Sequence, residues 1–362
     1  MPHFARPPSL LKKISEDSDT SDDEIPQSLN TVYRKMNHMK PVIGSWKDGF
    51  DSFEDYCIPG TGVTYRIYSA GTKGPLVFCI HGAGASGLSF TLLAKNVKSF
   101  CRLVAPDLRG HGIDMPICLQ LGHSVIENEK DLSASTLIQE TILLINHVLP
   151  DIEKNKRIPI VLIGHSMGGG LAVQVAIDPS IRERIKGLIV IDVVEGTALE
   201  SLQVMTNVLK KRPLHFFDYQ EAIDWSLDSH LLQNRASAMI SIPDQLVERD
   251  GLLYWRTNLF ETEPYWVSWY KDMSKHFLEA PAVKMLLLAG RERLDTTLTI
   301  GQMQGKFQMV LMNGCGHYIH EDAPEEIGMN IQKYLFRYNL MGDKTNEEAL
   351  RERIQRERAM LY

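Results

Sequence analysis

The chain has 362 residues, of which 44% are hydrophobic, and a formal net charge of −6 at pH 7. This length suits one large α/β domain with insertions, or two smaller domains. The weakly acidic balance argues against general nucleic-acid binding, no apolar run has membrane-spanning length, and the first residues contain no continuous hydrophobic segment like that of a signal peptide. We therefore expect neither a nucleic acid nor a membrane as a partner.

The two ends of the chain are more charged than its middle. Residues 1–45 pass from a short basic patch into an acidic, serine-rich block, which predicts a disordered, solvated tail. At the other end, NEEALRERIQRERAMLY predicts a charged C-terminal helix within residues 341–362. Between these segments, residues 46–340 are expected to form the folded domain.

Short apolar runs alternate with helical stretches from residue 63 onward. Several runs are apolar on both faces, as expected for strands of a parallel sheet that helices cover on both sides. The expected strands are residues 63–69, 75–80, 101–106, 158–163, 187–192, 283–290 and 307–312. Ser133 can cap a helix that ends before Pro150. This alternation predicts a doubly wound α/β sheet.

Residues 193 to about 280 interrupt the alternation. The interval is far longer than a crossover needs, and its pattern is that of several helices carrying four tryptophans: Trp225, Trp255, Trp266 and Trp269. We expect an inserted cap over the strand ends, where α/β folds place their sites. Most of these tryptophans are expected to be ordinary packing residues of the insertion.

The five cysteines indicate a reducing compartment. They are scattered along the chain: Cys57, Cys79, Cys101, Cys118 and Cys315. No CxxC pair or His/Cys cluster has zinc-ligand spacing. We therefore expect reduced core thiols in a cytoplasmic or nuclear protein, and no metal.

Two glycine-rich turns follow expected strands, and the first allows a dinucleotide site. HGAGASG places Gly82, Gly84 and Gly87 in GxGxxG spacing, and Asp107 lies at about the distance expected of a ribose-binding acid. This interpretation, a nucleotide-dependent oxidoreductase, leaves most of the remaining sequence unexplained.

The second turn, GHSMG at residues 164–168, has the GxSxG pattern of a nucleophile elbow. It lacks the lysine that a phosphate-binding Walker loop requires. The two glycines remove the clashes of a sharp bend at Ser166, and the helix that starts at Met167 directs backbone N–H groups toward an oxyanion. We expect the N–H groups of Met167 and Ala83 to form the oxyanion hole.

A serine hydrolase of this fold also needs an acid and then a histidine, each after a later strand. His317 follows the last expected strand on a Gly-Cys-Gly loop. His320 is a nearby alternative, but it lacks the flanking glycines that would let its ring reach inward. Asp192 and Asp295 both follow strands, and either carboxylate could orient the histidine. The residues alone leave the choice of acid open.

Four segments resemble those of the protein phosphatase methylesterases: GHSMGG, IDVVEGTA at 191–198, RLDTTLTIGQMQGKFQM at 293–309, and CGHYIHEDAP. These α/β-hydrolases remove the methyl ester from the C-terminal leucine of the type-2A protein phosphatase catalytic subunit. The resemblance covers roughly residues 45–340. It implies that Asp192 is the acid of a triad with Ser166 and His317, that no cofactor is needed, and that the methylated phosphatase is the partner. DLRGHG at 107–112 is shared by many α/β-hydrolases, which accounts for Asp107 without a ribose.

Two alternatives of other kinds remain open. The chain could be a different α/β-hydrolase, such as a lipase, thioesterase or aminopeptidase, on the same scaffold. It could also be mainly a binding protein that sequesters the phosphatase, with hydrolysis incidental. The presence of Ser166, Asp192 and His317 weighs against the second alternative.

Overall fold

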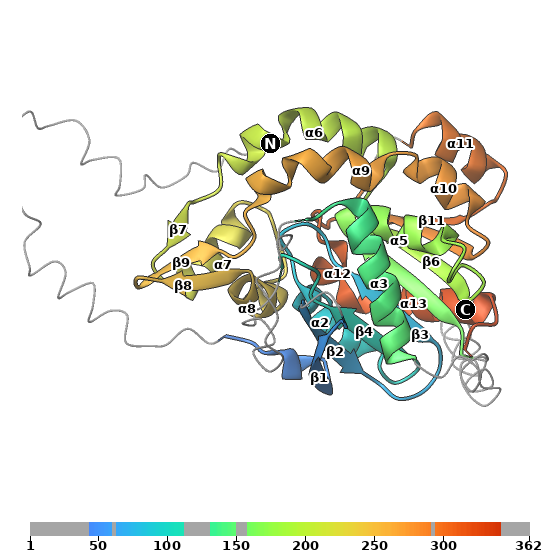
Figure 1. Cartoon of the computed structure of the whole chain (residues 1–362), viewed down its shortest axis with the longest axis horizontal. Helices are drawn as coiled ribbons and strands as arrows, with labels where there is room; N and C mark the ends of the chain where they lie inside the picture. Colours follow the sequence, from blue (N-terminus) through green and yellow to red (C-terminus); the bar gives the residue numbers. More distant parts are fainter. Residues whose placement is uncertain (1–42, 60–62, 112–130, 150–157, 291–293, 342–362) are drawn as a thin grey trace, which may run out of the picture. The chain divides into compact units, whose positions relative to one another are not determined.

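Figure 1 shows a computed structural model of the chain, which describes residues 43–59, 63–111, 131–149, 158–290 and 294–341. The statements below concern these residues. Most of the expected tail (residues 1–42) and most of the expected C-terminal helix (residues 342–362) lie outside them. Both segments therefore stay predictions.

The seven expected strands and one further strand, β1, form an eight-stranded sheet in the order β1-β2-β4-β3-β5-β6-β10-β11. Its strands are β1 (Ser52–Cys57), β2 (Thr64–Ala70), β3 (Leu76–Ile80), β4 (Arg102–Pro106), β5 (Ile160–His165), β6 (Ile185–Ile191), β10 (Val283–Leu288) and β11 (Gln308–Leu311). β2 runs antiparallel to β1 and β4, and the other neighbours are parallel. The predicted doubly wound, mostly parallel sheet is confirmed, and all seven expected strands are present with bounds within two residues of those predicted.

β1 is the strand of this sheet that periodicity does not predict. It lies at the edge, pairs with β2, and has four exposed and two half-buried residues in SFEDYC. Because a charged, exposed edge strand carries no apolar run, the sequence pattern does not mark it.

Helices pack on both faces of the sheet because successive strand residues point to opposite sides. In β3, Phe78 and Ile80 belong to one apolar cluster, and Val77 and Cys79 belong to another. The helices and short 3-10 turns around the sheet are η2 (Trp46–Asp48), η3 (Gly87–Phe90), α2 (Thr91–Val97), α3 (Ala134–Val148), α5 (Met167–Ile177), α11 (Thr296–Met303), α12 (Ile319–Asp322) and α13 (Pro324–Arg337). The predicted helix after Ser133 is confirmed as α3, which Ser133 caps. No helix in the described ranges is both long and apolar enough to cross a membrane.

The insertion between β6 and β10 contains helices, as predicted, but also a second sheet. Its elements are α6 (Glu195–Leu209), β7 (His215–Phe216), α7 (Tyr219–Asp228), α8 (Arg235–Asp244), β8 (Leu246–Arg249), β9 (Leu252–Trp255), η4 (Leu259–Tyr265), α9 (Trp266–Tyr270) and α10 (Met273–Glu279). The strands pair antiparallel in the order β7-β9-β8, so Trp255 lies on a strand and not on a helix. Strands of two to four residues are too short to show a period-two pattern, which is why they were not predicted.

The insertion packs against the start of α5. Figure 1 shows α6 and α9 side by side, with α9 next to α5. A Cβ atom at Gly170, in the first turn of α5, would lie only 2.1 Å from the carbonyl oxygen of Trp269 in α9. Because α5 follows β5 directly, the insertion lies over the carboxyl end of this central strand, where a site is expected.

Candidate active site

Ser166 lies on a sharp turn between β5 and α5. Its backbone angles, φ 52° and ψ −118°, belong to a region that L residues rarely adopt. A Cβ atom at Gly164 would lie 2.1 Å from the Gly168 carbonyl oxygen, and one at Gly168 would lie 2.1 Å from that of Ile80. Since both obstacles are backbone atoms, only glycine fits at these two positions. The GxSxG spacing thus produces a strained bend with Ser166 at its apex.

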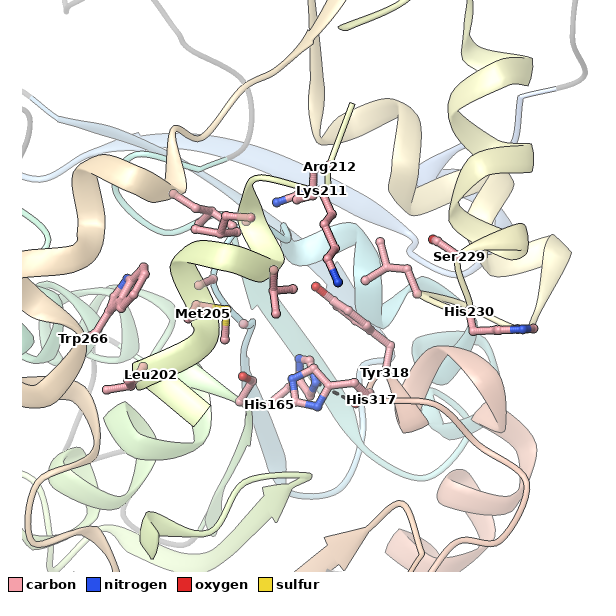
Figure 2. Close-up of a pocket in the computed structure, with 18 of the residues that line it drawn as sticks. His165, Leu202, Met205, Lys211, Arg212, Ser229, His230, Trp266, His317 and Tyr318 are labelled. Carbon is pink, nitrogen blue, oxygen red and sulfur yellow. Dashed lines mark hydrogen bonds between the residues drawn. The ribbon is translucent and has the colours of Figure 1, made fainter. Parts of the chain in front are cut away.

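A cavity of about 540 Å³ opens beside Ser166 and His317 (Figure 2). Its wall is largely apolar and comes mainly from the insertion: Leu202, Met205, Val208, Leu209, Trp225, Leu231, Leu259, Trp266, Trp269 and Tyr270. Three of the four tryptophans therefore line the cavity, so the prediction that most of them are only packing residues is incomplete. The cavity suits an apolar side chain that leads to Ser166.

Asp192 and His317 are joined by a hydrogen bond. The Nδ1–H of His317 donates to the Asp192 carboxylate at 2.7 Å, and the Ala289 N–H donates to the other carboxylate oxygen at 2.7 Å. The Asp192 side chain is 4% exposed, whereas that of His317 is 48% exposed. A fixed, buried carboxylate therefore orients an imidazole whose other nitrogen is left for the cavity.

The competing acid, Asp295, has a different role. One of its oxygens accepts a hydrogen bond from the Leu298 N–H at 2.9 Å, which caps α11. Its other oxygen accepts a hydrogen bond from the Ser274 hydroxyl. The structure thus brings Asp192, and not Asp295, to His317.

The Ser166 hydroxyl and the His317 ring line the same cavity, but within the described ranges no hydrogen bond joins them. The Ser166 hydroxyl is also close to Tyr270. Burial raises the pKa of Tyr270 to about 12, and the contact with Ser166 has a smaller, opposite effect. Contacts between a nucleophile and its base are often long before substrate binds.

The N–H groups expected to form the oxyanion hole belong to Met167, which is fully buried, and to Ala83. Met167 is the first residue of α5, and Ala83 lies in the loop after β3 and lines the cavity. In the part of the chain that the structure describes, neither N–H donates a hydrogen bond to another group. The loop also abuts the nucleophile, because a Cβ atom at Gly82 would lie 3.3 Å from the Ser166 Cβ.

The glycine loop considered for a dinucleotide is held from inside the protein. Asp107 is buried, and its carboxylate accepts a hydrogen bond from the Gly87 N–H at 2.8 Å. The His81 ring bonds the Gly82 carbonyl at 2.8 Å and accepts from the Leu108 N–H at 2.9 Å. Asp107 therefore anchors the loop instead of facing a ribose. Elsewhere in the described ranges, no group of three or more His, Cys, Asp or Glu side chains is arranged to hold a metal ion.

His320 reaches inward, contrary to the prediction. Its ring is fully buried and stacks on Phe90, with ring centroids 4.6 Å apart. Neither ring nitrogen has a hydrogen-bond partner among the described residues, and burial lowers the pKa of His320 to about 3. The short helix α12, and not flanking glycines, turns this ring into the core. It does not line the cavity, which is why it does not compete with His317.

His165 is a residue near the site that sequence reasoning missed. Its Nε2–H donates to the backbone carbonyl of His317 at 2.9 Å, and the ring is 1% exposed. Burial holds the pKa of His165 well below its usual range, so the ring stays neutral. Gly82 leaves room for it, since a Cβ atom there would lie 2.8 Å from the His165 Nδ1. His165 thus ties the nucleophile turn to the His317 loop, and its only sequence signal is its place beside Ser166.

We expect His165→Leu to lower kcat for ester hydrolysis about 10-fold with KM within about twofold, because small displacements of a catalytic group slow the chemical step. His165→Gln can still donate to the same carbonyl and should recover most of kcat. Steady-state kinetics of both variants, with thermal unfolding as a check on folding, measures this. Equal losses in the two variants, or a change in KM alone, would show that the hydrogen bond does not position His317.

Known proteins resemble this chain in both sequence and fold. The model of the Alpha/beta hydrolase family matches residues 76–328. A probable protein phosphatase methylesterase 1 of Caenorhabditis elegans is 38% identical over 302 residues, covering 83% of this chain and 79% of that protein. Protein phosphatase methylesterase 1 of Schizosaccharomyces pombe is 36% identical over 327 residues, covering 87% of this chain and 91% of that protein. The crystal structure of E-2-(acetamidomethylene)succinate hydrolase has a TM-score of 0.61 at 18% identity, covers 78% of this chain and 99% of that chain, and shows the shared fold.

Proposed function

This chain belongs to the protein phosphatase methylesterases, a family of α/β-hydrolases, and we propose that it demethylates the C-terminal leucine methyl ester of the type-2A protein phosphatase catalytic subunit. The chain is a carboxylic ester hydrolase, so its site must supply a nucleophile, a base and an oxyanion stabiliser. The observation that carries the proposal is the hydrogen bond between His317 and the buried Asp192, beside the cavity onto which Ser166 opens.

In the proposed mechanism, His317 accepts the Ser166 proton as the serine oxygen attacks the ester carbonyl. Asp192 keeps the imidazole in the required tautomer and stabilises the imidazolium. The N–H groups of Met167 and Ala83 bind the oxyanion of the tetrahedral intermediate. The proton then passes from His317 to the leaving methoxide, which departs as methanol and leaves an acyl-enzyme. Water, deprotonated by His317, releases the free carboxylate and restores Ser166.

The cavity supports this substrate class. Its apolar wall can bury a leucine side chain, and burying such a side chain stabilises a complex by roughly 1.5–3 kcal/mol. No organic cofactor or metal takes part in the proposed reaction.

The domain organisation and the cellular location are also part of the proposal. We keep the predicted organisation: a tail over residues 1–45, a hydrolase domain over 46–340 with its cap at about 193–280, and a charged helix within 341–362. Within the described ranges the thiols of Cys79, Cys101 and Cys315 are free, and reduced thiols are consistent with the proposed cytoplasmic or nuclear location.

Release of methanol from the methylated phosphatase catalytic subunit tests this function. We expect turnover of that protein, slower turnover of a short peptide methyl ester ending in leucine, and little hydrolysis of acyl thioesters, triglycerides or aminoacyl amides. Preference for one of the other substrates would assign the chain to another hydrolase class. Tight binding of the phosphatase without methanol release would instead indicate a sequestering protein.

A further inference from the structure

Two basic side chains enter the cavity from the segment that follows α6. Lys211 and Arg212 line the cavity together with His317 and Tyr318, and Figure 2 shows a side chain of this basic pair reaching toward Tyr318. No aspartate or glutamate is among the described residues that line it. Neither basic side chain forms an ion pair or a hydrogen bond in the described part of the chain. The cavity therefore carries positive charge that no acidic side chain of the described residues neutralises.

Arg212 is the more strongly fixed of the two. Its guanidinium carbon lies 3.8 Å from the centroid of the Trp255 ring, a cation–π contact. The Trp255 indole N–H donates to the Pro213 carbonyl at 2.9 Å, which holds the ring in place beside the arginine. A guanidinium stacked in this way keeps its N–H groups, which lie in the plane of the group, for a ligand.

The surroundings of Arg212 make an anionic ligand favourable. Arg212 is half-buried, and burial lowers its pKa, although an arginine keeps its charge in proteins. Tyr318 also interacts with it, but burial raises the pKa of Tyr318 to about 12, so the phenol stays neutral at pH 7. A partly desolvated cation without a counter-charge is unfavourable, and an incoming anion removes that penalty.

We propose that Lys211 and Arg212 form an anion subsite that binds an acidic side chain of the substrate, located upstream of the methylated C-terminal residue. The inference rests on the proposed function. A methyl ester carries no charge, so the anion must come from another part of the substrate. The apolar wall then holds the terminal side chain near Ser166, while Arg212 binds a carboxylate or phosphate through paired N–H···O bonds.

Such a subsite acts on binding at a distance from the reacting carbonyl. An interaction made equally in the ground state and the transition state lowers KM and leaves kcat unchanged. Hydrogen bonds to charged groups are worth enough to give about a 10- to 100-fold effect on kcat/KM. The subsite would thus select a peptide with an acidic residue over an otherwise identical neutral one.

Short peptide methyl esters test the inference. The peptides differ at one position at a time among the three residues before the terminal leucine. At that position each series has aspartate, phosphoserine or asparagine. Methanol release gives kcat and KM for every peptide. We expect one position at which an acidic residue raises kcat/KM about 10- to 100-fold over asparagine, through KM. Comparison of the aspartate and phosphoserine series shows which anion the subsite prefers.

The variants are Arg212→Gln, Lys211→Gln and, as a matched control, Lys210→Gln. Lys210 is the preceding residue, and it is exposed and does not line the cavity. In Arg212→Gln, kcat/KM for the acidic peptide should fall to that of the asparagine peptide in the same variant. Lys211→Gln should give a smaller loss of selectivity, and Lys210→Gln none. Undiminished selectivity in Arg212→Gln, or no selectivity in the parent, would overturn the subsite. Failure of the parent to hydrolyse any peptide ester would instead overturn the proposed function.

Discussion

Replacement of Ser166 with alanine is expected to lower kcat for the methyl ester by at least about 10⁴-fold, because loss of the nucleophile in a serine hydrolase leaves only the catalysis that comes from binding and the oxyanion hole. The folded state should persist. Alanine keeps the Cβ atom and only removes a hydroxyl that faces the cavity, so neither the backbone strain at φ 52° nor the packing of the turn changes.

Methanol release and labelling by a fluorophosphonate measure this effect together. The parent should bind the probe covalently, and the Ser166→Ala variant should not. Ser229→Ala is a matched control, since Ser229 also lines the cavity but lies after α7, far along the chain from the nucleophile turn. Turnover in Ser166→Ala within about tenfold of the parent would exclude a Ser166 acyl-enzyme.

The parallel part of the fold can be predicted from local pattern. Strands such as β3 and β5 are buried on both faces, so each appears as a continuous apolar run with turn residues on either side. The strands that were missed lack this property. β1 is mostly exposed, and β7 to β9 are too short for any periodicity to show.

Some features of the candidate site can be predicted from residues close in sequence, whereas others depend on contacts between distant segments. The turn at Ser166 can be predicted from two glycines within five residues, although only the clash at Gly164 is with neighbouring backbone and the clash at Gly168 is with Ile80 in β3. The choice between Asp192 and Asp295 depends on which strand end lies next to the His317 loop, and residue type gives no information about that. The resemblance to a family supplied Asp192 before the structure showed its hydrogen bond to His317.

Contacts that join distant segments were missed for the same reason. His165 bonds a carbonyl 152 residues further along the chain, and nothing in the motif indicates the partner. Similarly, KKR at residues 210–212 has the pattern of an ordinary solvated basic run. Only the fold shows that Arg212 stacks on Trp255 and lines a cavity that has no acidic residue among those described.

The second large effect is expected for Asp192→Asn, which should lower kcat by about 10⁴-fold. The geometry around the carboxylate gives the reason. The Ala289 N–H donates to one oxygen at 2.7 Å, so an asparagine would keep its carbonyl oxygen there and turn its NH₂ group toward His317. The Nδ1 of His317 must then accept, which places the ring proton on Nε2, and a protonated Nε2 cannot take the proton from Ser166.

Asp295→Asn is the matched control for this substitution, since it makes the same chemical change in the other aspartate considered as the catalytic acid. Its oxygen caps α11 through the Leu298 N–H, and asparagine caps helices about as well as aspartate, so both kcat and the free energy of unfolding should stay close to those of the parent. Steady-state kinetics and urea unfolding of the two variants decide the assignment. A large loss of kcat in Asp295→Asn with little loss in Asp192→Asn would make Asp295 the catalytic acid, and the hydrogen bond between Asp192 and His317 would then be structural only.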